Sequence, residues 1–272
     1  MLRPYLAVLG ARYREVLQYR SAAVANSVVQ LFWGGIRLMV LAAFFASAST
    51  EPPMAFAAVV AYIWLGQAFF GLLPYSLDPD IQRKFLEGNV AWELLRPVNL
   101  YAFWYARTFA HRVADTTIRM LPLLFVALWV LPWVGLDAWA LKPPPSLASG
   151  IAFAVALFGM AALATAVTML FQTTLFWLVS GRGLQACMYG LISLLSGLAV
   201  PLPLLPAWLQ PALYWQPFRG LGDTPFRIYS GDIAASAAPV EIALQFGWTA
   251  VFVGIGYAVL SRGRGRLVIQ GG

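Results

Sequence analysis

Polar side chains recur at regular intervals inside a long apolar stretch near the start of the chain. Asn26, Gln30 and Arg37 lie within residues 22–46. With Trp33 or Gly34 between Gln30 and Arg37, successive members of this face are three or four residues apart. An arginine at the centre of a membrane helix costs about 2.5–3.5 kcal/mol. Arg37 therefore either extends toward the headgroups or lies on a substrate path, where it would attract an anionic group. Both interpretations stay open.

A second polar face lies in the apolar stretch 148–175. Thr165, Thr168 and Gln172 share one helical face and are further candidates for a substrate path. The alternative is structural, because threonine hydroxyls in helices commonly bond to their own backbone. In the stretch 184–202, small residues form a face that is typical of close helix packing.

A short charged element, FLEGNVAWELLRPVNL at residues 85–100, separates two apolar stretches. Asn89 is a plausible helix cap, and apolar residues follow at helical spacing. Pro97 ends this helix, since a residue before proline avoids the α region. Asn99 then caps a second helix that continues toward Arg107. The apolar face of the first helix needs a partner, either the membrane surface or another protein.

Enzymatic and metal chemistry finds little support in the residue types. His111 is the single histidine and Cys187 the single cysteine, so neither a zinc site nor a catalytic triad can be placed. No G-x-x-x-x-G-K-[ST] phosphate loop occurs, and neither Lys84 nor Lys142 follows a glycine. The chain cannot hydrolyse ATP by that route. An enzyme is the least favoured function class.

The composition places these residues in a membrane. Hydrophobic residues make up 61% of the 272 residues and charged residues 11%, whereas soluble domains carry about 25% charged residues. Apolar runs of about 20 residues predict transmembrane helices. We expect an all-α integral membrane protein with one domain, 1–272. Six spans are predicted: 22–46, 54–77, 112–133, 148–175, 184–202 and 240–260.

Three segments lie outside these spans. Residues 1–21 alternate arginines with apolar side chains, which predicts an amphipathic helix on the membrane interface. Residues 78–111 and 201–239 are the longer connections, the second with aromatic residues expected at headgroup depth. Thirteen basic residues fall on the side of both termini and three on the other. The positive-inside rule then puts both termini and 78–111 in the cytoplasm. The net charge of +7 reflects this bias, and nucleic-acid binding is not expected.

The whole chain resembles a permease subunit of a bacterial type 2 ABC exporter. The stretch from Gly88 to Leu94-Leu95-Arg96-Pro97 is similar to the "G…LLRP" pattern of a poorly characterised permease subfamily. The resemblance implies that residues 80–96 form a coupling helix that docks on a separate ATPase, which would bind ATP and magnesium, while this chain carries no cofactor. The docking residues it implies are Glu87, Gly88, Trp92, Glu93, Leu94, Leu95, Arg96 and Pro97.

The same resemblance implies a second permease as partner, a related different chain or a second copy, in the bacterial inner membrane. We therefore expect the chain to form half of the translocation path of an ATP-driven exporter. The alternative is an ion- or proton-coupled secondary transporter. Such proteins usually need an acidic residue at mid-membrane, and Asp115 and Glu241 fall at the ends of the predicted spans.

Overall fold

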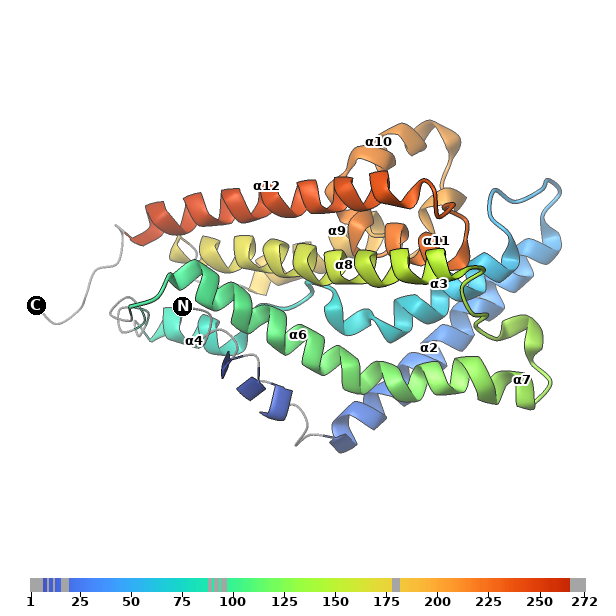
Figure 1. The fold of residues 1–272 in the computed structure, drawn as a ribbon, viewed down its shortest axis with the longest axis horizontal. Coiled ribbons are helices and arrows are strands. Elements are labelled where there is room, and N and C mark those ends of the chain that lie inside the picture. The colour runs from blue at the N-terminus through green and yellow to red at the C-terminus, as the bar shows by residue number, and fades with distance from the viewer. Residues whose placement is uncertain are drawn as a thin grey trace, which may run out of the picture.

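The protein is a bundle of helices elongated along one axis (Figure 1). A computed structural model describes residues 7, 8, 10, 11, 13–15, 20–87, 90, 93, 97–177 and 182–264. Within these residues every regular element is helical, as the all-α prediction requires. The described part of the N-terminal segment, between residues 7 and 15, is helical as well.

Four stretches are long and apolar enough to cross a bilayer. They lie in α2 (Arg20–Ser47), α6 (Leu100–Phe125) with its continuation, α8 (Leu147–Thr173) and α12 (Ala238–Arg264). α12 runs along α8, with α6 beneath them (Figure 1). Two shorter apolar helices, α3 (Phe56–Ala68) and α9 (Arg182–Leu195), fall where the second and fifth spans are predicted. The six-span topology stays a prediction.

α3 is the centre of the core. Its 13 residues rise about 20 Å, too little for a hydrocarbon core about 30 Å thick. Residues 58–68 are all buried, and a helix that is apolar on every side belongs inside a bundle. The 3-10 turn η1 (Phe70–Leu72) and an irregular stretch follow before α4 (Pro79–Leu86). The predicted stretch 54–77 is therefore a buried helix that ends early.

α6 begins at Leu100, well before the predicted start at 112. Asn99 caps it, with its side-chain oxygen accepting a hydrogen bond of 3.0 Å from the Ala102 N–H. This confirms the predicted cap. α6 continues through a π-helical turn, η2 (Val126–Val130), into α7 (Leu131–Trp133). The segment from Leu100 to Trp133 is one uninterrupted candidate span of 34 residues.

Short helices fill the connection between α9 and α12, which corresponds to residues 201–239 of the sequence. They are η5 (Leu202–Leu204), η6 (Ala207–Leu209), α10 (Gln210–Trp215), η7 (Pro217–Leu221) and α11 (Asp223–Ser230). The remaining turns are η3 (Asp137–Trp139) and η4 (Thr174–Phe176). We call the end of the bundle that carries α4 and the last turns of α12 the inner end, and the end that carries α7 and α10 the outer end (Figure 1).

Candidate functional site

The inner end holds a charged junction between α4 and α6. Asp78 caps α4, since its carboxylate accepts a 2.9 Å hydrogen bond from the Asp80 N–H. Arg107 of α6 reaches the same carboxylate through Nε at 3.1 Å and also pairs with Asp80. The side chains of Arg107 and Asp78 are both 9% exposed, so these charges are largely removed from water and require one another. α4 is thereby attached to the inner third of α6.

Glu93 joins the later part of the predicted coupling segment to α4, its first part, and to α6. Its carboxylate pairs with Lys84 of α4 and accepts a 3.0 Å hydrogen bond from Nε1 of Trp104 on α6. Glu93 is 3% exposed and Trp104 is fully buried. Glu93 therefore holds the segment on the bundle, whereas Glu87 and Pro97 are exposed. Gly88, Trp92, Leu94, Leu95 and Arg96 lie outside the described residues.

Part of the segment's apolar face packs inside the same chain. Val90 is fully buried in the second apolar cluster, which joins α4, α6, α8 and α12. The buried members of this cluster are Ile81, Val90, Leu100, Tyr101, Phe103, Trp104, Met169 and Leu260. Val8 of the N-terminal segment packs against it. Movement of the segment is therefore opposed by contacts with three long helices.

Arg112 ties α6 to the end of the α3–η1 segment and to α8. One terminal nitrogen donates to the carbonyls of Leu72 and Leu73. The other donates to the Ser76 carbonyl at 2.9 Å and to the Thr168 hydroxyl at 2.7 Å. Arg112 is 6% exposed. The carbonyls where η1 ends lack helical partners, and the guanidinium supplies them with donors.

A small polar cavity lies beside this arginine. Its volume is about 130 Å³, and its lining includes Asp78, Thr108, His111, Arg112 and Asp115. The Thr108 hydroxyl is buried without a hydrogen-bond partner among the described residues. The structure places Asp115 in the middle of the long helix, paired with Arg119 of the next turn at 2.7 Å. Because α6 starts at Leu100, Asp115 lies well inside the helix, and its place at the end of a membrane span stays a prediction.

The candidate path residues of α8 face the interior of the chain. Thr165, Thr168 and Gln172 each have 0% exposure. The Thr165 hydroxyl donates to the Ala161 carbonyl at 2.7 Å and Thr168 to Ala164 at 2.8 Å, the backbone bonding that is typical of threonine in helices. Neither amide atom of Gln172 finds a partner within the described residues. A substrate could contact these three side chains only if the helices around α8 moved apart.

The polar candidates of α2, Asn26, Gln30 and Arg37, are all partly buried. Arg37 donates a 2.8 Å hydrogen bond from Nη1 to the backbone carbonyl of Leu198, beyond the end of α9. Ser27, which the sequence did not single out, is buried and donates to the Arg119 carbonyl at 2.8 Å. The predicted path candidates on α2 and α8 therefore make separate contacts.

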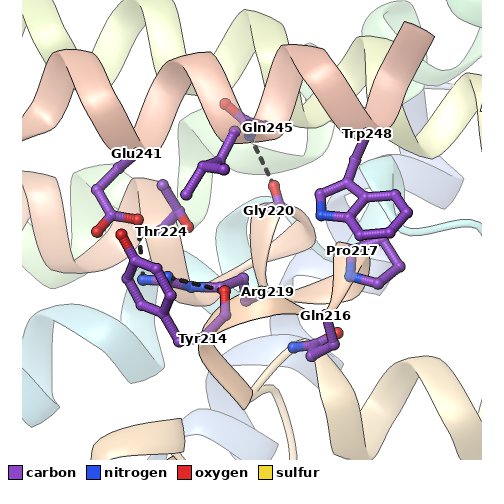
Figure 2. Close-up of a pocket in the computed structure, with 10 residues that line it drawn as sticks. Tyr214, Gln216, Pro217, Arg219, Gly220, Thr224, Glu241, Gln245 and Trp248 are labelled. Carbon is purple, nitrogen blue, oxygen red and sulfur yellow. Dashed lines mark hydrogen bonds and ion pairs between the residues drawn. The ribbon is translucent and has the colours of Figure 1, made fainter. Parts of the chain in front are cut away.

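Sequence reasoning missed a charged network at the outer end. Arg219 pairs with Glu241 at 3.1 Å and lies 3.6 Å from Asp223, while Tyr214 stacks on its guanidinium (Figure 2). Arg227 pairs with Asp223 at 3.3 Å and with Asp232 at 2.6 Å. Burial raises the pKa of the Asp223 carboxyl, against the effect of the two arginines. The four-residue spacing from Arg219 through Asp223 to Arg227 was the signal available in the sequence.

Comparison with known families identifies the class of protein. A family described as ABC-2 family transporter protein matches residues 31–271, which covers α2 through α12. The chain belongs to this family. No curated protein matches the chain significantly. The ABC-2 membership makes the chain a membrane component of an ABC transporter, a permease without an ATPase motif of its own.

For the ABC-2 permease, the family implies an ABC ATPase as partner in general. The inner end is the part of the chain where the sequence predicts docking of such a partner.

Proposed function

We propose that this permease forms half of the translocation path of an ATP-driven exporter and receives force from a separate ATPase through residues 80–96. ATP and magnesium bind in that partner chain. A second permease, either a related chain or a second copy, completes the path. The "G…LLRP" stretch supports the subfamily that the sequence resembles. The match to the ABC-2 family supports the class of this function.

The observation that carries the proposal is the attachment of Glu93. A segment that only rests on the membrane surface needs no buried polar link to the bundle. Glu93 instead accepts a hydrogen bond from Trp104 of α6 in a buried position, while its ion pair with Lys84 joins the two parts of the segment. A push on the segment, which includes α4, would therefore move the start of α6, because Arg107 of α6 pairs with Asp78 and Asp80 at α4 and buried ion pairs are costly to separate.

The same contacts suggest how movement continues. Arg107 joins α4 to α6, and Arg112, five residues further, joins α6 to the Leu73 carbonyl and to Thr168 of α8. Force applied at the inner end then reaches the buried α3 and the polar face of α8. ATP binding in the partner would bias the permease between two arrangements of these helices. In the open arrangement Thr165, Thr168 and Gln172 would line the path.

The membrane placement is part of the proposal. Both termini lie in the cytoplasm of a bacterial cell, with the chain in the inner membrane, six spans, and the N-terminal segment on the interface. α3 and α9 serve as the second and fifth spans, each completed by irregular chain buried in protein, where such backbone is tolerated at membrane depth. The exposed Trp208 and Trp215 at the outer end suit a headgroup layer.

Asp115 is the observation that favours the alternative, an ion-coupled secondary transporter. It lies mid-helix beside a polar cavity with His111, the setting in which coupling ions and protons bind. However, its charge is already compensated by Arg119. ABC-2 membership favours the ATP-driven exporter over this alternative.

Purification of the tagged chain from its host, with mass spectrometry and an ATPase assay, tests the proposal. We expect an ATP-binding protein and a second six-span permease to copurify. Leu94→Asp with Leu95→Asp should release the ATPase while the permease stays inserted. Leu136→Asp, at an exposed position just after α7, is the matched control and should retain it. A chain that purifies alone without ATPase activity contradicts the proposal and favours secondary transport.

A further inference from the structure

The outer end contains a cavity that the proposed function does not use. It lies among η5, η6, α10 and α11, and its volume is about 430 Å³, within the range of small-molecule sites. Its lining includes both apolar and charged side chains. The lining residues are Leu202, Ala207, Gln210, Pro211, Leu213, Tyr214, Arg219, Asp223 and Arg227.

The charged part of the lining offers a guanidinium edge to a ligand. Arg227 pairs through Nε with Asp232 and through Nη1 with Asp223. Its other terminal nitrogen, Nη2, meets no acceptor in the part of the chain that the structure describes, and the side chain is 24% exposed. Two N–H groups of a fixed, permanently charged donor remain available. An anionic oxygen is the partner that such a donor prefers.

The second arginine shapes the cavity without being free itself. Arg219 donates to the Tyr214 carbonyl at 3.2 Å, pairs with Glu241 and stacks under the Tyr214 ring. Its side chain is 8% exposed. Among the lining residues two arginines face one aspartate, and Asp223 is 1% exposed. Asp232 and Glu241 pair with the two arginines from outside the lining, and Arg227 is the most exposed charged side chain of the lining itself.

The surroundings select for an apolar tail. Leu202, Pro211 and Leu213 supply apolar surface to the lining. Trp208 of η6 and Trp215, the last residue of α10, are 78% and 63% exposed. Exposed tryptophans of this kind lie at headgroup depth in membrane proteins. A ligand that enters here meets the boundary between water and hydrocarbon.

We propose that this cavity binds an amphipathic anion, with a phosphate-type headgroup on Arg227 and an apolar part against Leu202 and Leu213. The ligand chemistry fits both a lipid of the outer leaflet and an amphipathic molecule released by the transporter. The inference concerns the permease alone and does not depend on the ATPase or on the direction of transport.

Titration of the purified permease in phosphatidylcholine nanodiscs tests the site. The probes are dihexanoyl-phosphatidylglycerol, dihexanoyl-phosphatidylcholine and inorganic phosphate. We expect the phosphatidylglycerol to bind about tenfold or more tightly than either of the others. Equal binding of the phosphatidylcholine overturns the anionic selectivity, and equal binding of phosphate overturns the apolar subsite.

Variants assign the binding to this cavity. Arg227→Gln should weaken phosphatidylglycerol binding about tenfold, and Arg227→Lys should weaken it less. Because Arg227 also binds two aspartates, Ala207→Trp provides a second test that fills the cavity without removing a charge. Ala212→Trp, on exposed α10 but outside the lining, is its control. Equal binding by the two tryptophan variants overturns the proposal.

A further pair of measurements identifies the source of the ligand. If a bilayer lipid occupies the cavity, added probe should no longer bind in nanodiscs made with long-chain phosphatidylglycerol. If the cavity admits only molecules from solution, the probe should bind equally in both kinds of nanodisc. Either result supports the site and assigns its source.

Discussion

Arg37 of α2 binds the chain just beyond the end of α9, donating a 2.8 Å hydrogen bond from Nη1 to the carbonyl of Leu198 across 161 residues of sequence. Carbonyls closer to the helix are bound as well, Leu195 by the Gln216 side chain and Ser196 by the Asp223 N–H. Irregular backbone in apolar surroundings needs such donors, because its carbonyls have no helical partners. The arginine therefore satisfies a backbone acceptor inside the protein.

Arg37→Met distinguishes an arginine that binds the Leu198 carbonyl from one that only reaches the headgroups. Removal of an arginine from hydrocarbon should stabilise the protein if the side chain has no partner. Removal of the donor to Leu198, a residue that is 4% exposed, should instead destabilise it by about 1–3 kcal/mol. We expect a lower thermal unfolding temperature in detergent, with Arg37→Lys in between. If the unfolding temperature lies above that of the wild type, the hydrogen bond from Arg37 to Leu198 does not stabilise the protein.

Gly34 permits the close approach of α2 and α3. A Cβ atom at this position would lie 2.7 Å from Cζ3 of Trp64 and 3.1 Å from Cγ of Gln67. Trp64 cannot easily retreat, because its indole N–H donates to the Trp139 carbonyl at 2.8 Å. Gly34→Ala should therefore cost about 1–3 kcal/mol through overpacking. The measurement is thermal unfolding of the purified permease.

The neighbouring glycine supplies the control. Nothing lies within 4 Å of a Cβ atom at Gly35, so Gly35→Ala should be neutral or stabilise the helix by up to about 1 kcal/mol. Equal destabilisation by both substitutions would mean that the loss comes from helix flexibility rather than from contact with Trp64.

The sequence predicted the features that depend on local chemistry. Asn99 as a helix cap and the short helices of 201–239 follow from residues close together in the chain. Apolar composition located the long helices, but it could not show that α3 is only 13 residues long. Pro74 and the irregular stretch around it lie within an apolar run, and hydropathy does not distinguish a buried loop from a span.

Long-range pairings explain what the sequence could not predict. The sequence offered only headgroups or a substrate as partners for Arg37. It missed the actual partner, the Leu198 carbonyl, because this is a backbone atom far along the chain. Arg112 was counted as a cytoplasmic charge, yet it is buried against Thr168 of α8. A backbone acceptor leaves no signature in residue types, so such contacts emerge only from the fold.

The buried pair of Glu93 and Lys84 should show strong thermodynamic coupling. Glu93→Gln and Lys84→Met each remove one charge from a pair whose glutamate is 3% exposed. The double substitution should destabilise the permease by about 1–3 kcal/mol less than the sum of the two single substitutions. The 25% exposure of Lys84 lowers this below the value for a fully buried pair. Thermal or denaturant unfolding in detergent measures all three variants.

Arg83→Met is the matched control for the Lys84 substitution. Arg83 pairs with Asp80 at 3.0 Å on the same helix, but its side chain is 64% exposed. An exposed pair of this kind contributes about 0–1 kcal/mol. A loss at Arg83 as large as that at Lys84 would show that substitution in α4 itself, rather than the link to Glu93, destabilises the protein.

Arg112→Lys tests whether α6 transmits movement to α3 and α8. Lysine keeps the charge but loses the planar fork that reaches Leu73, Ser76 and Thr168 together. With the ATPase bound, spin labels at Arg83→Cys, which is exposed on α4, and Leu136→Cys in a Cys187→Ser background should report a nucleotide-dependent change in distance between the two ends of the bundle. We expect Arg112→Lys to retain ATPase binding and lose most of that change. Arg119→Lys, whose acidic partner Asp115 lies on its own helix, should keep it, because that pair joins no second element. An unchanged distance response in Arg112→Lys would separate this arginine from transmission and leave it as a support for the end of η1.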